Sequence, residues 1–303
     1  METKWLKMTD GASLFARVYP KPDARSIVFI LHGLAEHGGR YDDFALYLRD
    51  KGYEVVVPDH RGHGETGQLA GELGYFADEQ GFERVVDDCN ELIHLHTANQ
   101  SDKTIILLGH SMGSFLARRY VQKYPQVIDQ LILVGTGGDP GFMGKVGSRI
   151  AAWKSRGNGA KEHGHLMNKL TFGSYNKQIS EPVSEFDWLS TDEETVRAYE
   201  EDPLCGFVSS NQLYVDLLDG LQTIHSKKEL ERVPKNLPIL LIAGTDDPVG
   251  NYGKGVRLLA RDYQKIGMED VTLVLIEQER HEILNGSNRH KVYDQIANWI
   301  VKK

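Results

Sequence analysis

The chain has 303 residues, of which 26% are charged and 40% hydrophobic, and its formal net charge is −8. This length allows one α/β core with an insertion, and the acidic balance without a Lys/Arg run argues against nucleic-acid binding. The first residues lack the apolar run of a signal peptide, and apolar runs elsewhere are shorter than a membrane span. We therefore expect a cytoplasmic protein in which Cys89 and Cys205 are buried thiols, because they form no disulfide or metal-binding pattern.

The chain begins with a segment of alternating polarity and continues with apolar strands and helical segments in turn. Residues 5–19 alternate around Asp10-Gly11, which predicts a β-hairpin. Apolar runs predict further strands at 26–31, 54–57, 104–108, 131–134, 238–243 and 271–276. Helices are predicted at 41–50, 82–97, 114–124, 252–266 and 290–301. Continuous apolar strands between helices predict a mostly parallel central sheet that is flanked by helices on both faces.

This alternation stops between residues 137 and 203, where a glycine-rich turn opens a segment with many aromatic residues. We expect residues 137–203 to form a helical cap over the carboxyl edge of the sheet, where open α/β folds bind ligands. Residues 1–136 and 204–303 then form the core. Apolar side chains of the cap either line an acyl tunnel or form the cap's own core; examples are Met143, Met167, Phe172 and Phe186.

A short motif, Gly109-His110-Ser111-Met112-Gly113, joins the predicted strand 104–108 to a predicted helix. A strand, a tight turn with serine at its apex and a helix is the layout of a nucleophile elbow. Side chains two positions before and after the serine would clash in so sharp a turn, which favours glycine there. G-x-S-x-G also occurs by chance, and Gly-rich strand–helix turns can bind phosphates. The flanking strand and helix favour a catalytic Ser111.

A catalytic serine needs a base and a carboxylate that orients it. In the hydrolase fold that carries this elbow, the chain order is Ser, then Asp or Glu, then His. Asp246 and Asp247 both follow the predicted strand 238–243, and we favour Asp247 because it precedes a proline. Two histidines lie beyond this loop. We favour His281, which follows a predicted strand, over His290, which begins the last predicted helix.

The oxyanion of the reaction needs two N–H donors. One is expected from Met112, the residue after the nucleophile. The second is expected from Leu34, in the loop after the strand 26–31, because the small Gly33 lets this loop approach Ser111.

Four segments together resemble a known family. The loop His-Gly-Leu-Ala-Glu-His-Gly-Gly-Arg-Tyr at 32–41 is similar to the H-G-x-x-E-H-x-x-R-Y signature of monoacylglycerol lipases and related lysophospholipases, which belong with the serine-aminopeptidase-type α/β-hydrolases. Residues 58–64 resemble the family's D-x-R-G-H-G turn, residues 109–113 its G-H-S-M-G elbow, and 202–204 its D-P-L element. The resemblance covers nearly the whole chain and is weakest in the cap.

This resemblance implies an α/β-hydrolase fold with an inserted helical cap, and a triad of Ser111, Asp247 and His281. It also implies that Glu36, Arg40 and His110 lie near the polar head of the substrate, although Glu36 and Arg40 have the alternative of bracing their loop as an ion pair. No metal or cofactor is expected. His163 and His165 are the nearest approach to a metal site in the sequence, and no third ligand accompanies them.

The expected activity is hydrolysis of lipid esters, either monoacylglycerols or lysophospholipids, by a serine hydrolase, with transient membrane-surface contact through the cap. One alternative is a general carboxylesterase or thioesterase that acts on short soluble esters, and a peptidase or amidase is less favoured. A non-catalytic binding protein of the same fold is another alternative, but such proteins often lose a triad member, and this chain has all three. The sequence does not indicate an oligomeric state.

Overall fold

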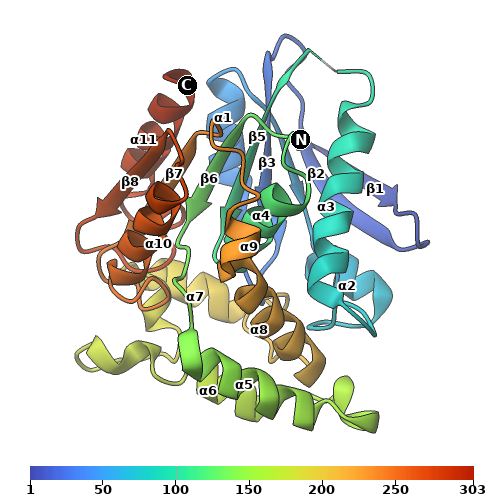
Figure 1. The fold of residues 1–303 in the computed structure, drawn as a ribbon, viewed down its shortest axis with the longest axis vertical. Helices are drawn as coiled ribbons and strands as arrows, with labels where there is room; N and C mark the ends of the chain where they lie inside the picture. The colour runs from blue at the N-terminus through green and yellow to red at the C-terminus, as the bar shows by residue number, and fades with distance from the viewer. Residues whose placement is uncertain (101) are drawn as a thin grey trace.

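The computed structural model describes residues 1–100 and 102–303. Within these residues, strands form one sheet in the order β1-β2-β4-β3-β5-β6-β7-β8 (Figure 1). The β1–β2 and β2–β4 pairs are antiparallel and the other pairs are parallel. The strands are β1 (Glu2–Lys7), β2 (Ser13–Tyr19), β3 (Ser26–Leu31), β4 (Glu54–Pro58), β5 (Thr104–His110), β6 (Gln130–Val134), β7 (Ile239–Gly244) and β8 (Val271–Ile276). The predicted hairpin and the mostly parallel sheet are confirmed.

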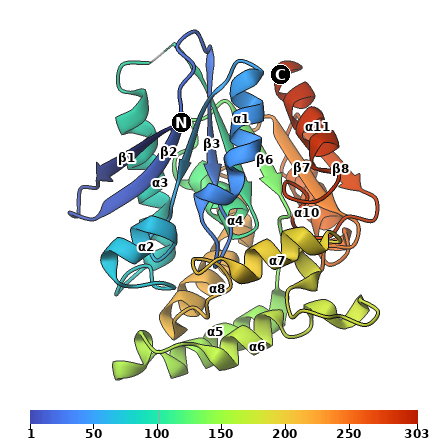
Figure 2. The same cartoon turned by 180° about the vertical axis from the view of Figure 1, so that it is seen from behind.

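Helices cover both faces of the sheet, as Figures 1 and 2 show. Side chains of α3 (Gly81–Thr97), α4 (Met112–Lys123), α8 (Asn211–His225) and α10 (Lys254–Lys265) join one hydrophobic cluster, and those of α1 (Asp42–Asp50) and α11 (Arg289–Val301) join the other. Each central strand serves both clusters. In β3, Phe29 faces the first cluster and Val28 the second, which is why this strand is apolar throughout.

The segment between β6 and α8 contains helices and turns and no strand among its residues, all of which the structure describes. It contains α5 (Gly141–Lys154), α6 (His165–Phe172) and α7 (Glu193–Glu201), with short 3-10 turns between them. These helices lie below the sheet in Figures 1 and 2. The parallel strands β3, β5 and β7 all end toward the same edge, so their carboxyl-terminal loops converge there.

Three helices were missing from the sequence prediction: α2 (Gly64–Ala70), α8 and α9 (Lys227–Leu230). Two glycines in the seven residues of α2 give it a low helix propensity. In α8, Gly220 interrupts the pattern, but a Cβ there would lie 2.5 Å from the ring of Phe82, so the glycine allows α8 to pack closely on α3. Because α8 contacts α5 as well as α3 and α4, it joins the segment below the sheet to the core.

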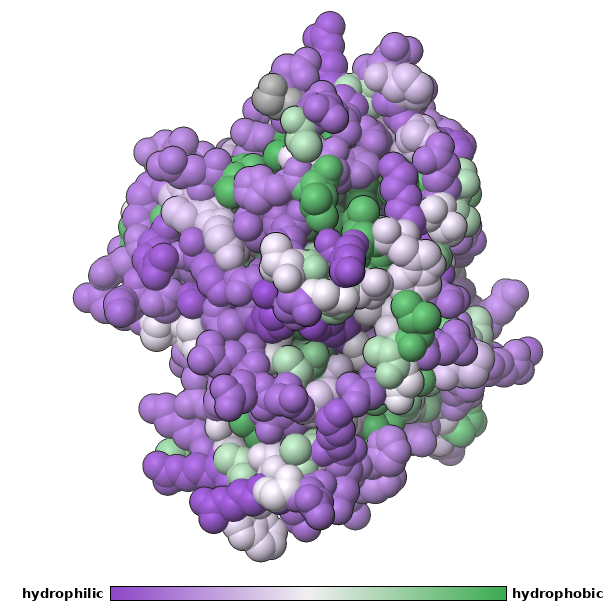
Figure 3. Space-filling model, turned by 90° about the vertical axis from the view of Figure 1, so that its right-hand side faces the viewer, coloured by the Kyte–Doolittle hydropathy of each residue, from purple (hydrophilic) through white to green (hydrophobic). Residues whose placement is uncertain are grey.

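No helix in the described part of the chain is both long and apolar enough to span a membrane. The face drawn in Figure 3 is mainly hydrophilic, and its hydrophobic residues form small separate groups. Several large apolar side chains on α5, on α6 and in the segment before α7 are nevertheless exposed: Phe142, Met143, Trp153, Leu166, Leu170 and Val183.

Candidate active site

Ser111 lies in the sharp turn between β5 and α4, as the motif predicted. Its φ is 51° and its ψ −121°, a conformation that a residue with a side chain rarely adopts. The Ser111 amide donates to the carbonyl of Val134 at 3.0 Å, and the amide of Ser114 donates to the Ser111 carbonyl at 2.9 Å. These contacts hold the strained residue at the carboxyl edge of the sheet, directly before the first N–H groups of α4.

The two glycines of the motif are required by contacts with backbone rather than with flexible side chains. A Cβ on Gly109 would lie 2.2 Å from the carbonyl oxygen of Gly113, and a Cβ on Gly113 would lie 2.1 Å from that of Leu31. The elbow therefore packs against the end of β3. Glycine is needed at both positions for the steric reason that was expected from the sequence.

Asp247 and His281 come together from the loops after β7 and β8. Their side chains are buried, and Nδ1 of His281 lies 3.0 Å from Oδ2 of Asp247. Asp247 also accepts from the amide of Val249 at 2.8 Å, which fixes the carboxylate. Asp246 is exposed and its carboxylate contacts the hydroxyl of Thr245. Of the two candidates, it is Asp247 that reaches the histidine, whereas His290 lies in α11.

The loop after β3 approaches the elbow closely at Gly33. A Cβ on Gly33 would lie 3.2 Å from the Cβ of Ser111 and 2.6 Å from Oε1 of Glu36. The neighbouring Leu34 amide donates to no backbone or side-chain acceptor among the residues that the structure describes. The amide of Met112 lies in the first turn of α4, where no intrahelical acceptor is available. Within the described part of the chain, neither predicted oxyanion donor is therefore used by another acceptor.

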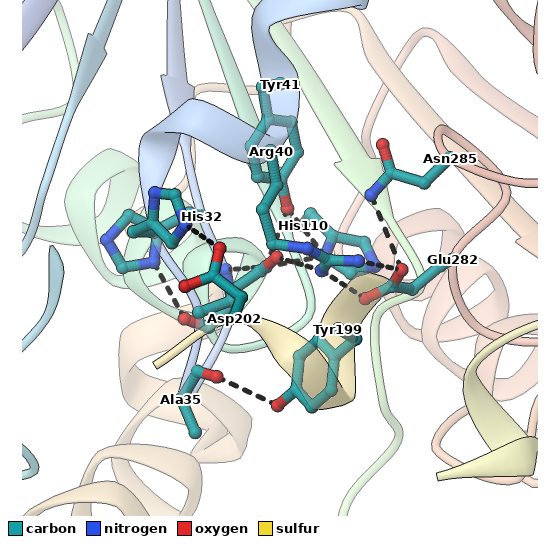
Figure 4. A network of polar contacts seen from close by, with 12 residues as sticks. His32, Ala35, Arg40, Tyr41, His110, Tyr199, Asp202, Glu282 and Asn285 are labelled. Atoms are coloured by element: carbon teal, nitrogen blue, oxygen red, sulfur yellow. Dashed lines mark hydrogen bonds and ion pairs between the residues drawn. The ribbon is translucent and has the colours of Figure 1, made fainter. Parts of the chain in front are cut away.

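Glu36, Arg40 and His110 form one network with Glu282. Figure 4 shows Arg40, His110 and Glu282 in this network. Glu36 accepts from Nη1 of Arg40 at 2.6 Å and lies 3.2 Å from Nδ1 of His110. Both terminal nitrogens of the Arg40 guanidinium donate to the carboxylate of Glu282. The hydroxyl of Tyr41 lies 2.7 Å from Glu36 and 2.8 Å from Nδ1 of His110. Arg40 therefore joins the loop after β3 to the loop that carries His281.

The groups of this network shift one another's pKa toward the charged form. Burial alone would raise the pKa of Glu36, but its hydrogen bond with His110 and the charge of Arg40 outweigh burial and hold that pKa well below its usual range. Burial alone would lower the pKa of His110, but the hydrogen bond and charge of Glu36 raise it. Nε2 of His110 also lies 3.4 Å from the carbonyl oxygen of His281. An imidazolium at His110 would thus have an acceptor at each nitrogen.

A cavity of about 310 Å³ opens beside the elbow. Ser111, His281, Leu34, Glu36 and His110 line it, whereas Arg40 does not. Much of the remaining wall is aromatic and is supplied by Phe172, Phe186, Trp188, Tyr199 and Phe207.

The four apolar side chains of residues 137–203 that were considered from the sequence take three different places. Phe172 and Phe186 line this cavity, while Met167 is 2% exposed and packs among the residues of the segment below the sheet. Met143 is 73% exposed. The tunnel interpretation therefore fits the two phenylalanines and the core interpretation fits Met167, but neither fits Met143.

Several residues that support the site were not identified from the sequence. Glu282 is the second partner of Arg40. A Cβ on Gly135 would lie 3.1 Å from the His281 ring and 3.4 Å from the His110 ring, so this glycine makes room for both. Arg280 donates to the carbonyls of Asp187 and Ser190 at 2.6 and 2.8 Å, which ties the histidine loop to the segment before α7. Of these residues, only Gly135 had a sequence signal that could have identified it, because it is a glycine directly after β6.

One group of potential metal ligands occurs in the described residues: His37, Asp202 and Cys205. Nδ1 of His37 accepts from the amide of Gly39 at 3.1 Å, so the proton of a neutral ring is on Nε2, which lies 2.9 Å from Asp202. A protonated Nε2 does not bind a metal ion, and this arrangement fits a hydrogen bond instead. His163 is used differently, with Nδ1 lying 2.9 Å from the carbonyl of Val208.

Comparison with known proteins identifies the family. A family model described as serine aminopeptidase, S33, matches residues 22–288. The chain belongs to the serine aminopeptidase S33 family. It is similar to a monoacylglycerol lipase of Mycolicibacterium smegmatis, with 28% identity over 93% of this chain and 90% of the relative. It is also similar to a monoglyceride lipase of Mus musculus, with 27% identity over 96% of this chain and 85% of the relative.

A solved structure shows the same fold along the whole length of this S33-family chain. A thermostable carboxyl esterase from Bacillus coagulans in complex with glycerol superposes with a TM-score of 0.93, at 27% identity, covering 99% of this chain and 98% of the esterase. The fold is therefore the α/β-hydrolase fold, as expected from the sequence. Family, relatives and fold together place the chain among the carboxylic ester hydrolases.

Proposed function

We propose that the protein hydrolyses lipid esters with a single acyl chain, either monoacylglycerols or lysophospholipids, through a Ser111–His281–Asp247 triad. The observation that carries this proposal is the buried hydrogen bond between His281 and Asp247 at one wall of the cavity that Ser111 also lines. The names of the Mycolicibacterium smegmatis and Mus musculus relatives and the aromatic wall of the cavity support a lipid ester as substrate.

In the proposed mechanism, Nε2 of His281 takes the proton of Ser111 while Asp247 holds the imidazole by Nδ1. The Ser111 oxygen attacks the ester carbonyl, and the amides of Leu34 and Met112 stabilise the oxyanion. The alcohol leaves with the proton from His281, and water then releases the fatty acid by the same route. Each amide donor is expected to contribute about 10²–10³ in rate.

Glu36 and His110 are proposed to face the polar head of the substrate, because both line the cavity beside Ser111. Arg40 stands behind them, where it contacts Glu36 and Glu282 instead of the cavity. We propose that Arg40 acts indirectly by holding Glu36 in place. Glu36 and His110 thus keep the substrate-binding role that was expected from the sequence. For Arg40 we favour the alternative, in which it braces its loop.

Residues 137–203 are proposed to act as the cap over this cavity. Phe172, Phe186 and Trp188, which belong to this segment, supply part of the cavity wall. Exposed apolar side chains on α5 and α6, such as Phe142 and Leu170, support transient contact of the cap with a lipid surface during substrate uptake.

The alternative function is a carboxylesterase for short soluble esters, which the similarity to the Bacillus coagulans esterase favours. Turnover of monoacylglycerols from C8 to C18, lysophosphatidylcholine, short p-nitrophenyl esters and an aminoacyl p-nitroanilide separates these possibilities. We expect the highest kcat/KM on a long-chain monoacylglycerol or lysophospholipid. A preference for acetate or butyrate esters would select the alternative.

The role of Ser111 is tested with Ser111→Ala. This variant should lose covalent labelling by a fluorophosphonate probe and nearly all ester turnover, because the attacking oxygen is gone. Ser114→Ala is the matched control, since its hydroxyl donates to the Ser111 carbonyl at 2.5 Å but is not the apical oxygen. Full labelling of Ser111→Ala would refute the assignment.

A further inference from the structure

The loop after β3 holds a strained residue directly after the proposed oxyanion donor. Ala35 has φ of 53°, in the left-handed region, which is strained for a residue with a Cβ. Leu34 and Ala35 form one turn, so a relaxation of Ala35 would redirect the Leu34 N–H. Contacts outside this turn must therefore stabilise it.

Two donors that also line the cavity meet on the carbonyl of Ala35. The hydroxyl of Tyr199, in α7, donates to this oxygen at 2.8 Å (Figure 4). The amide of Gly206 donates to it at 2.9 Å. Glu36 holds the other end of the turn by accepting from the amide of Gly33 at 2.5 Å. Of these contacts, the Tyr199 bond is the one that joins the turn to a helix below the sheet.

The ring of Tyr199 is fixed independently of its hydroxyl. It is 6% exposed, the guanidinium carbon of Arg40 lies 4.8 Å from its centroid, and the ring of Phe186 lies 5.1 Å away. Burial raises the pKa of the Tyr199 phenol well above its usual value, so the hydroxyl keeps its proton and remains a donor. A second contact also joins the end of α7 to the loop after β3. The carboxylate of Asp202, directly after α7, lies 2.9 Å from Nε2 of His37.

We propose that Tyr199 is a positioning residue that couples α7 to the oxyanion site: its hydroxyl holds the strained Ala35 peptide and so aims the Leu34 N–H at the reacting carbonyl. The inference rests on the proposed ester hydrolysis and adds a condition to it. The oxyanion site is complete only while α7 is seated against the loop after β3. A displacement of α7 that breaks the Tyr199 bond lowers the rate of the chemical step even when substrate is bound.

The test is Tyr199→Phe, which removes the hydroxyl and keeps the ring against Arg40 and Phe186. Gly206 still donates to the Ala35 carbonyl, so no buried acceptor is left without a partner and the fold should persist. We expect kcat to fall about tenfold, because one oxyanion donor is misdirected, while KM changes little. Affinity for a boronic acid, which forms a tetrahedral adduct with the nucleophile, should fall by a similar factor.

Tyr120→Phe is the matched control, because its phenol donates to Asn90 at 3.1 Å in the core, away from the loop after β3. Thermal unfolding of both variants measures how much stability the protein loses when a phenol hydrogen bond is removed. The inference is overturned if Tyr199→Phe retains wild-type kcat, if it raises only KM, or if Tyr120→Phe loses as much kcat.

A second substitution tests the role of strain. Glycine adopts a positive φ without steric cost, so Ala35→Gly in the Tyr199→Phe background should recover part of the lost kcat. No recovery would contradict strain at Ala35 as the reason. Failure of the proposed function looks different, because the wild-type protein would then hydrolyse no ester of the panel and would not bind the boronic acid.

Discussion

Two buried polar groups lie side by side at the carboxyl edge of the sheet, and they are built differently. In the Asp247–His281 pair, Nδ1 of the imidazole is held by a carboxylate, while Nε2 has no hydrogen-bond partner among the described residues. In the Glu36–Arg40–Glu282–His110 network, each charged group meets partners of opposite charge or polarity. The rings of His281 and His110 are only 4.8 Å apart.

The difference indicates separate tasks. A general base needs one nitrogen free for the proton that it takes from the nucleophile. A saturated network, in contrast, resists change, because removing one member leaves a buried charge without compensation. We therefore expect substitutions in the pair to affect catalysis without loss of stability, and substitutions in the network to affect stability first.

The largest effect is expected from Asp247→Asn. The amide would donate to Nδ1 rather than accept from it, so the imidazole would hold the wrong tautomer, and kcat should fall by about 10⁴ with little change in thermal stability. Asp246→Asn is the control and should stay close to wild type, because Asp246 is exposed. Steady-state kinetics on one ester decide the comparison, and a larger loss in Asp246→Asn would reverse the assignment.

The next effect is expected from Arg40→Met, which removes the cation between two buried carboxylates. Glu36 and Glu282 are 2% and 3% exposed, so we expect a loss of about 3–5 kcal/mol in the free energy of unfolding. Arg49→Met removes a surface pair with Asp50 and should cost about 1 kcal/mol or less. Urea unfolding compares the two. An equally stable Arg40→Met with a raised KM would instead place Arg40 in substrate binding.

The smallest effect is the pH dependence that His110 gives to stability. Because Glu36 raises the folded pKa of His110 against the effect of burial, the stabilisation is fully present below about pH 6.5 and is lost as pH rises through the folded pKa. His60 and His63, whose pKa burial lowers to about 3 and about 4, are neutral in this range.

Urea unfolding between pH 6 and pH 9 measures this loss, and His110→Asn is the comparison because its amide can still donate to Glu36. The wild-type protein should lose stability toward high pH, and the variant should lose less. Identical slopes would show that His110 does not change its charge in this range.

Much of the core was predictable because its signals are local. Strand β5, the elbow and α4 follow one another within twenty residues, and apolar runs of strand length identify the buried strands of the sheet. Helix α8 was missed because Gly220 lowers its helix propensity, and only the neighbouring Phe82 ring explains that glycine. Glu282 follows the expected base directly, but nothing local distinguishes it from the other glutamates of its loop.

The sequence by itself determined that Ser111 sits in a turn between a strand and a helix, because the steric limits on Gly109 and Gly113 act within a few residues. It also offered Ser111, then Asp246 or Asp247, then His281 along the chain, which is the order expected for a nucleophile, a carboxylate and a base in the hydrolase fold. The tertiary structure alone decided that Asp247 rather than Asp246 meets His281, and that Arg40 braces two loops behind the cavity. It alone placed Tyr199 on the Ala35 carbonyl, 164 residues away in the chain. Such contacts depend on how separate elements pack, and no local pattern records that.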